Sequence, residues 1–107
     1  MEVTVEDVKR RLDSGEKLAL IDVREPFEHR AARIEGAELV PMQTVPEHLP
    51  ALQEQAGQAP LIVFCHHGVR SLNVVNWLRR QGVDNCWSMA GGIDLWSLTI
   101  DPTVPRY

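Results

Sequence analysis

A single cysteine stands between a short apolar run and a segment with helical spacing. Cys65 follows Leu-Ile-Val-Phe at residues 61–64 and precedes His-His-Gly-Val-Arg-Ser. The apolar run is short, β-branched and preceded by proline, which predicts a buried strand. Leu72, Val75 and Leu78 then recur at the spacing of a helix. Peptide N–H groups in such a loop, with a helix N-terminus behind them, form an anion-binding cavity that favours a thiolate. The sequence therefore predicts that Cys65 is a nucleophile.

Size and composition restrict the functions open to this chain. Its 107 residues are expected to form one domain, residues 1–107, with a single core. The formal net charge of −4 argues against nucleic acid as a partner, because no basic stripe would neutralise phosphates. No apolar run approaches the roughly 18–20 residues that span a bilayer, and the N-terminus does not resemble a signal peptide. Two cysteines in such a chain indicate reduced thiols, so we expect a cytoplasmic protein with no membrane contact.

Helices and strands are expected to alternate along the chain. Thr4 can cap a first helix and Gly15 can end it. Further strands are predicted at 18–23, 37–40, 61–64 and 83–89, and helices at 26–32, 46–55, 71–81 and 93–98, before an extended tail at 101–107. Such alternation implies a parallel sheet covered on both sides. Ligands bind at the carboxyl ends of strands in these sheets, which is where Asp22, Arg24 and Cys65 fall.

Four fragments of the chain resemble the rhodanese (sulfurtransferase) homology domain. They are Ile-Asp-Val-Arg-Glu at 21–25, Arg-Ile-Glu-Gly-Ala at 33–37, the cysteine loop at 65–71 and Gly-Gly-Ile-Asp-Leu-Trp at 91–96. The resemblance implies an α/β fold, a three-layer sandwich in which helices flank a central, mainly parallel five-stranded sheet. It also implies an enzyme of the thiosulfate sulfurtransferase type, which moves a sulfane sulfur from thiosulfate or a persulfide donor to a thiophilic acceptor. No metal or organic cofactor is implied.

The resemblance assigns roles to the loop and to the neighbouring strand end. Cys65 is expected to be the nucleophile and then to carry the sulfur as a persulfide, held by loop amides. Arg70 would present a cation to an anionic donor, and Ser71 would cap the following helix. The substrate-binding set is expected to be His66, His67, Gly68, Val69, Arg70 and Ser71. Asp22 and Arg24 are expected to brace the loop without touching sulfur.

Several other residues are expected to have structural roles. The adjacent His66 and His67 match no usual zinc-ligand spacing, so no metal site is predicted. Cys86 lies in a predicted strand without a basic neighbour, which indicates a structural thiol, although a redox role stays open. His29 and His48 lie on polar helical stretches and are expected to be solvated.

The composition of the loop bears on the choice of substrate. The chain has Arg33 where the family often has a histidine, and its loop lacks the Cys-Gly-Ser/Ala-Gly pattern of mercaptopyruvate-type enzymes. Its bulky, basic residues favour a compact anion such as thiosulfate, or a protein persulfide. Related cell-cycle phosphatases place five residues between cysteine and arginine, whereas four separate Cys65 from Arg70 here. The tighter loop suits one sulfur atom and crowds a tetrahedral oxyanion.

Two further functions stay open. One is a rhodanese-like binding module without catalysis, although such copies usually lack the cysteine. The other is a sulfur relay, because residues 101–107 look like the tails of rhodanese modules fused to ubiquitin-activating-like enzymes, which pass sulfur to small carrier proteins for cofactor or tRNA thiolation. The expected partners are therefore a small anionic sulfur donor and, in a relay, a sulfur-carrier protein or a cysteine desulfurase.

Overall fold

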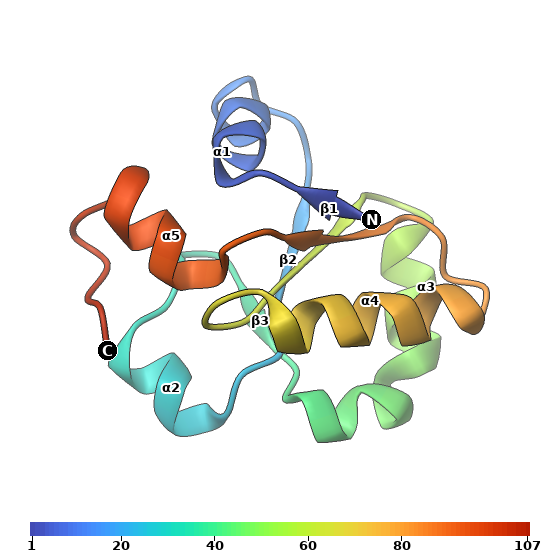
Figure 1. The fold of residues 1–107 in the computed structure, drawn as a ribbon. Helices are drawn as coiled ribbons and strands as arrows, with labels where there is room; N and C mark the ends of the chain where they lie inside the picture. The colour runs from blue at the N-terminus through green and yellow to red at the C-terminus, as the bar shows by residue number, and fades with distance from the viewer.

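Five short strands form a single sheet in the computed structural model, which describes residues 1–107 (Figure 1). The strands are β1 (Glu2–Val3), β2 (Ala19–Asp22), β3 (Glu38–Leu39), β4 (Leu61–Phe64) and β5 (Cys86–Met89). Their order across the sheet is β1-β5-β4-β2-β3, and every neighbouring pair is parallel. β4 is the central strand, and all five carboxyl ends therefore face the same edge of the sheet.

Five α-helices and one 3₁₀-helix connect the strands. They are α1 (Val5–Asp13), α2 (Pro26–Ala31), the 3₁₀-helix η1 (Met42–His48), α3 (Leu49–Ala56), α4 (Val69–Arg80) and α5 (Gly92–Thr99). The start of α1 is the predicted one, because the Thr4 hydroxyl accepts a hydrogen bond from the Asp7 N–H at 3.0 Å. No helix combines the length and the apolar composition that crossing a bilayer requires.

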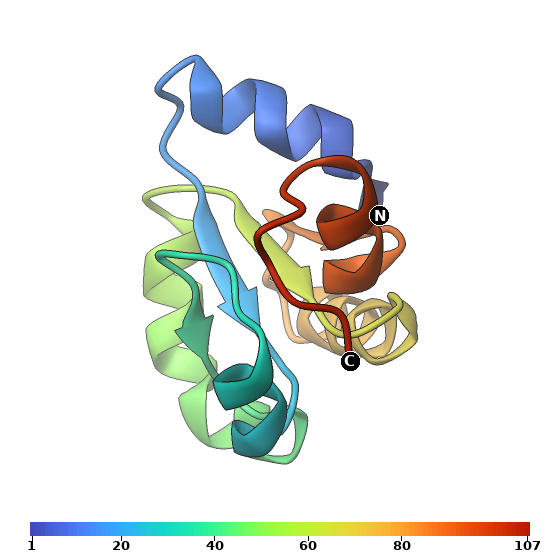
Figure 2. The same ribbon diagram turned by 90° about the vertical axis from the view of Figure 1, so that its left-hand side faces the viewer.

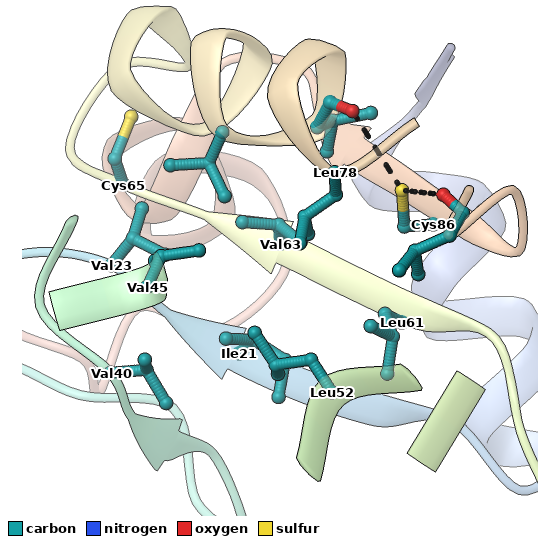
Figure 3. Close-up of a cluster of buried hydrophobic side chains, with 13 residues drawn as sticks. Ile21, Val23, Val40, Val45, Leu52, Leu61, Val63, Cys65, Leu78 and Cys86 are labelled. Carbon is teal, nitrogen blue, oxygen red and sulfur yellow. Dashed lines mark hydrogen bonds between the residues drawn. The ribbon is translucent and has the colours of Figure 1, made fainter. Parts of the chain in front are cut away.

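Alternate side chains of β4 build a separate core on each face of the sheet. Leu61 and Val63 belong to a cluster of buried side chains that includes Leu52 of α3 and Val75 and Leu78 of α4 (Figure 3). The next cluster, on the opposite face, contains Ile62, Phe64, Val5 and Val8 of α1, and Ile93 and Trp96 of α5. Successive residues of a strand point to opposite faces of the sheet, so a strand in which every residue is apolar must be covered by other elements on both faces. The result is the three-layer α/β sandwich that the resemblance implied.

The helix after the cysteine loop begins earlier than the sequence predicted. α4 starts at Val69 rather than Ser71, because Gly68 adopts φ +108° and ends the loop there. The helix ends close to the predicted place: Gly82 has φ +92°, and the Val83 N–H donates to the Leu78 carbonyl at 3.0 Å. That bond keeps Val83 out of the sheet, so β5 is shorter than the predicted strand at 83–89.

Two other elements differ from the predictions. The helix expected at 46–55 is divided between η1 and α3, and each carries a proline, Pro46 in η1 and Pro50 in the first turn of α3. A proline has no N–H and clashes with the preceding turn, so a helix ends and a new one starts between them. β1 was not among the predicted strands, because two residues are too few to show a period.

The C-terminal segment folds back onto the domain. Residues 101–107 were expected to be extended, but the Val104 N–H donates to the Asp101 carbonyl at 3.1 Å and closes a turn. Val104 is buried in the core beside α5, and the Ser97 hydroxyl donates to its carbonyl. Figure 2 shows this segment running from α5 toward the loop that precedes α4.

Candidate functional site

The site forms at the carboxyl edge of the sheet, where β4 ends. Cys65 directly follows β4, and its Sγ accepts hydrogen bonds from the Gly68 N–H at 3.1 Å and the Ser71 N–H at 3.4 Å. The residue is 1% exposed, and in Figure 3 its sulfur points away from the labelled core side chains. Two of the predicted loop amides therefore converge on the sulfur. Such a pair of donors stabilises a negative charge on one atom.

Ser71 has a different place from the predicted one. It does not cap α4, because it is the third residue of that helix, and Gly68 occupies the N-cap position. Its hydroxyl lies 3.5 Å from Cys65 Sγ, 2.7 Å from the Ser88 hydroxyl and 3.2 Å from the Gly68 carbonyl. Ser88 of β5 is fully buried and was not singled out in the sequence. The only feature of the sequence that could have pointed to Ser88 is that a small polar residue lies within a mainly apolar strand.

The start of α5 fixes the backbone of the cysteine loop. The Ile93 N–H donates to the Cys65 carbonyl at 2.9 Å, and the Asp94 N–H donates to the His66 carbonyl at 3.1 Å. Gly92 has φ +62°, and a Cβ at this position would lie 2.4 Å from the His66 carbonyl oxygen. Gly92 is thus needed for the close approach of two backbones. The first amides of a helix, which have no partner inside it, bond the loop instead.

Arg70 is held by a carboxylate from another part of the chain. Its Nη1 donates to Glu28 Oε1 at 2.7 Å and its Nη2 to Oε2 at 2.9 Å. The Arg70 hydrogen bonds lower the pKa of Glu28 to about 2. The same hydrogen bonds raise the pKa of Arg70, and the charge of Cys65 adds a smaller effect in the same direction. Glu28 was not predicted as a site residue, because 42 positions separate it from Arg70 and only the fold brings them together.

Asp22 and Arg24 form a fully buried ion pair beneath the site. Arg24 donates to Asp22 Oδ1 at 2.8 Å and to Oδ2 at 2.7 Å. Its remaining donors reach the Glu28 carbonyl at 3.3 Å, the Ala32 carbonyl at 2.6 Å and the Tyr107 hydroxyl at 2.9 Å. These contacts brace α2 and the C-terminal segment rather than the cysteine loop itself. The pair reaches the loop indirectly, through Glu28 and its bond to Arg70 and through Tyr107, whose ring stacks on His66.

Three aromatic rings stack beside the loop. The His66 ring lies 3.9 Å from the His67 ring and 4.0 Å from the Tyr107 ring, measured between centroids. Burial and the neighbouring His67 lower the pKa of His66. The Tyr107 hydroxyl donates to Glu28 Oε2 at 2.7 Å, and burial raises the pKa of Tyr107 to about 12. Tyr107 had no predicted role, because nothing near it in the sequence indicates a contact with Arg24 or with Glu28 of α2.

The remaining candidates lie apart from the sulfur. Neither histidine that was expected to be solvated is simply so: His29 Nδ1 lies 2.9 Å from Asp22 Oδ2, and His48 Nδ1 lies 2.8 Å from the Thr44 carbonyl. Cys86 is buried against the Val83 carbonyl at 3.3 Å (Figure 3), and burial raises the pKa of its thiol. A buried thiol with a raised pKa is poorly reactive, which favours a structural role.

One group of side chains has the donor atoms of a metal site. The ligand atoms of His66, His67 and Asp94 lie within 4.8 Å of one another. Arg106 already occupies the carboxylate, with Nε donating to Asp94 Oδ1 at 2.9 Å and Nη2 to Oδ2 at 3.3 Å. A guanidinium on the only anionic ligand opposes the binding of a second cation. We therefore assign no metal to this group.

Known sequences and structures resemble the chain over most of its length. The family model described as "Rhodanese-like domain" matches residues 4–99. Over 99% of this chain, the sequence is 31% identical to the Arabidopsis thaliana "Rhodanese-like/PpiC domain-containing protein 12, chloroplastic". Over 98%, it is 33% identical to the Zea mays "Adenylyltransferase and sulfurtransferase MOCS3-2". The chain spans only 37% and 23% of the lengths of these two relatives.

Single-domain proteins match as well. "Thiosulfate sulfurtransferase GlpE" of Pseudoalteromonas translucida is 28% identical, over 85% of this chain and 84% of that protein. The solved structure of the "Human Single Domain Sulfurtranferase TSTD1" superposes with a TM-score of 0.77 at 28% identity, covering 92% of this chain and 96% of that one. A Staphylococcus saprophyticus protein superposes with a TM-score of 0.82 at 29% identity and covers 99% of this chain and 100% of its own.

Proposed function

Because the chain belongs to the rhodanese-like domain family, we propose that it is a sulfurtransferase that carries sulfur as a persulfide on Cys65. The observation that supports this most directly is the pair of hydrogen bonds from the Gly68 and Ser71 amides to Cys65 Sγ. These donors would stabilise the attacking thiolate and the anionic outer sulfur that follows it. The polar contacts of Ser71 and Ser88 would hold the loop in that geometry.

The proposed reaction has two transfers. In the first, the Cys65 thiolate attacks the outer sulfur of thiosulfate; the S–S bond of the donor breaks and its electron pair leaves with sulfite. A persulfide donor RSSH reacts in the same way, forming the Cys65 persulfide and releasing RS⁻. In the second, a thiophilic acceptor such as cyanide attacks the outer sulfur, which leaves as thiocyanate and restores the thiolate. No cofactor is required, because each step breaks one sulfur–sulfur bond by nucleophilic attack and needs no external oxidant or reductant.

The related phosphatase chemistry is disfavoured by the arginine. Phosphate transfer at a cysteine needs donors that surround three oxygen atoms. Here four residues separate Cys65 from Arg70, and both ends of the guanidinium are bound to Glu28. A binding module without chemistry is disfavoured as well, because Cys65 is present and two amides converge on its sulfur.

Intact-mass measurement tests this proposal. After incubation with thiosulfate or a small persulfide, the protein is expected to gain one sulfur that cyanide removes. Cys65→Ser is expected to gain none and to unfold at nearly the same temperature as the wild type, because the substitution is close to isosteric. The matched control Cys86→Ser should still be loaded. Sulfur uptake by Cys65→Ser, or a Cys65 that neither donors nor alkylating reagents modify in the folded protein, would refute the assignment.

A sulfur relay is the second candidate. The plant relatives that match nearly the whole chain include a protein named as an adenylyltransferase and sulfurtransferase. In a relay, the Cys65 persulfide would be loaded by a cysteine desulfurase and would pass its sulfur to a sulfur-carrier protein. Both cysteines are free thiols, which fits a reducing compartment, and we propose a cytoplasmic setting. The test is to incubate persulfidated protein with an adenylated carrier ending in Gly-Gly and then to add a dithiol. The persulfide would displace AMP and form an acyl disulfide, which the dithiol reduces; a thiocarboxylate on the carrier then supports the relay, and its absence counts against it.

A further inference from the structure

The charges beside the Cys65 loop cancel in pairs. Both ends of the Arg70 guanidinium are bound to Glu28, and Arg106 is bound to Asp94 in the same manner. Burial and His67 lower the pKa of His66, which keeps that ring neutral at pH 7. The arginine of the loop, which would present a cation to an anionic donor, is therefore already neutralised.

Glu28 is fixed in this position by more than Arg70. Its Oε1 accepts the Glu25 N–H at 3.0 Å, and its Oε2 accepts the Tyr107 hydroxyl at 2.7 Å. Glu28 is 5% exposed, and the hydrogen bonds from Arg70 lower the pKa of its carboxyl to about 2, so the group is ionised at neutral pH. An anionic donor would thus have to compete with an intramolecular carboxylate that four hydrogen bonds hold in place.

An exposed apolar residue adjoins each partner of this ion pair in the sequence. Phe27, next to Glu28, is 63% exposed, and Val69, next to Arg70, is 71% exposed. Large apolar side chains at such exposure are the exception in this chain, and these two directly precede the partners of one ion pair. A surface of this kind favours a donor with an apolar carrier over a hydrated inorganic dianion.

We propose that Glu28 is a specificity-determining residue that cancels the charge of Arg70 and directs Cys65 toward persulfide donors rather than thiosulfate. The inference rests on the proposed function and selects its donor class. With RSSH the thiolate attacks the outer sulfur, the S–S bond breaks, and the departing RS⁻ takes the proton and leaves as RSH, so the reacting groups carry one negative charge throughout. With thiosulfate, the thiolate and a dianion must meet without a free cation between them.

The test is a comparison of two donors in single-turnover loading of Cys65. Rate constants are measured by quenching with an alkylating reagent and counting persulfidated protein by intact mass, with thiosulfate and with 2-hydroxyethyl persulfide. Glu28→Gln is expected to shift the ratio of these rate constants about tenfold toward thiosulfate, the effect of one freed charge-assisted hydrogen-bond donor. Glu54→Gln, the same change at an exposed carboxylate of α3, should leave the ratio unchanged. Adding Arg70→Met to Glu28→Gln should abolish the gain.

Salt dependence provides a measurement on the unchanged protein. A free Arg70 would make loading by thiosulfate fall as salt screens its attraction, whereas the neutralised pair predicts no fall. A wild type that prefers thiosulfate and is loaded more slowly as salt rises would overturn the inference. So would a Glu28→Gln variant whose ratio of donor rate constants is unchanged, provided that its thermal unfolding transition shows that it is folded. If neither donor loads Cys65, the proposed function itself fails, so the two failures are distinguishable.

Discussion

At the scale of single residues, the site depends on charges that are buried and paired. Asp22 and Arg24 are both fully buried, although charged side chains are seldom buried without a partner. Arg24 uses its donors on Asp22, on two carbonyl groups near α2 and on Tyr107. It therefore joins β2, α2 and the C-terminal segment at one point. A change at Arg24 should therefore lower stability directly, and it should affect sulfur transfer only as a consequence of the lower stability.

Replacing this arginine tests its structural role. Arg24→Met is expected to lower the free energy of unfolding by about 3–5 kcal/mol, because it leaves the Asp22 carboxylate buried without its partner. Urea denaturation measures this quantity. Arg33→Met, at an exposed position, should change it by less than about 0.5 kcal/mol. Equal effects of the two substitutions would contradict the role assigned to Arg24.

The pairing of Glu28 predicts a pH dependence of stability. Arg70 holds the pKa of Glu28 at about 2 in the folded protein, below the ordinary value of 4.5. A carboxyl group with a depressed pKa stabilises the fold above its unfolded pKa, and this contribution disappears as pH falls through the folded value. Glu28→Gln should therefore be less stable than the wild type at pH 7, and the difference should shrink between pH 4.5 and 2. A difference that stays constant over that range in denaturation curves would argue against the ion pair.

At the scale of elements, the contact between α5 and the cysteine loop sets the geometry around the sulfur. The first amides of α5 bond the carbonyl groups of Cys65 and His66, and Gly92 is the residue at which the two backbones approach each other most closely. The backbone carbonyl groups of the loop are thus bound by α5, and the Cys65 sulfur is bound by the loop's own amides. Neither contact depends on the type of side chain at positions 66 or 67.

A methyl group at Gly92 should disrupt this contact. In Gly92→Ala the added Cβ would lie 2.4 Å from the His66 carbonyl oxygen at φ +62°, so we expect a loss of about 3 kcal/mol or more. Gly15→Ala is the matched control: it has φ +84° with no atom within 4 Å of its Cβ, and should cost about 1–2 kcal/mol. Sulfur loading of Cys65 should slow only in Gly92→Ala. Similar stabilities and loading rates in the two variants would contradict this account.

At the scale of the whole molecule, residues that are far apart in the sequence meet beside α2. Tyr107 lies 79 positions from Glu28 and 83 from Arg24, yet its hydroxyl bonds both. Val104 reaches the core beside α5, so the C-terminal segment closes the molecule over the carboxyl edge of the sheet. The site is therefore assembled from the start, the middle and the end of the chain.

The Tyr107 hydroxyl should contribute measurably to stability. Tyr107→Phe keeps the ring stacked on His66 and removes the two hydrogen bonds, so the free energy of unfolding should fall by about 1–3 kcal/mol. Arg106→Met breaks only an exposed ion pair with Asp94 and should cost less than about 1 kcal/mol. Both values come from urea denaturation. An unchanged stability in Tyr107→Phe would mean that the C-terminal segment does not depend on this contact.

Local patterns were sufficient for most of the fold. The strand at 61–64 has the predicted bounds, since four apolar residues after a proline admit few alternatives. Thr4 and Gly82 mark helix ends as expected, because caps act within one turn of the chain. The boundaries that differed, at Val69 and between Pro46 and Pro50, depend on backbone angles that composition does not specify.

The amino-acid sequence by itself determined the parallel α/β architecture and the position of Cys65 at the end of a strand. Both follow from periodicity and from short-range steric rules. Only the tertiary structure decided which charge meets Arg70, that Ser71 lies beside the sulfur rather than at a helix cap, and that Tyr107 covers α2. These contacts join residues from 6 to 83 positions apart, and pairing over such distances depends on how the helices pack on the sheet rather than on any local pattern.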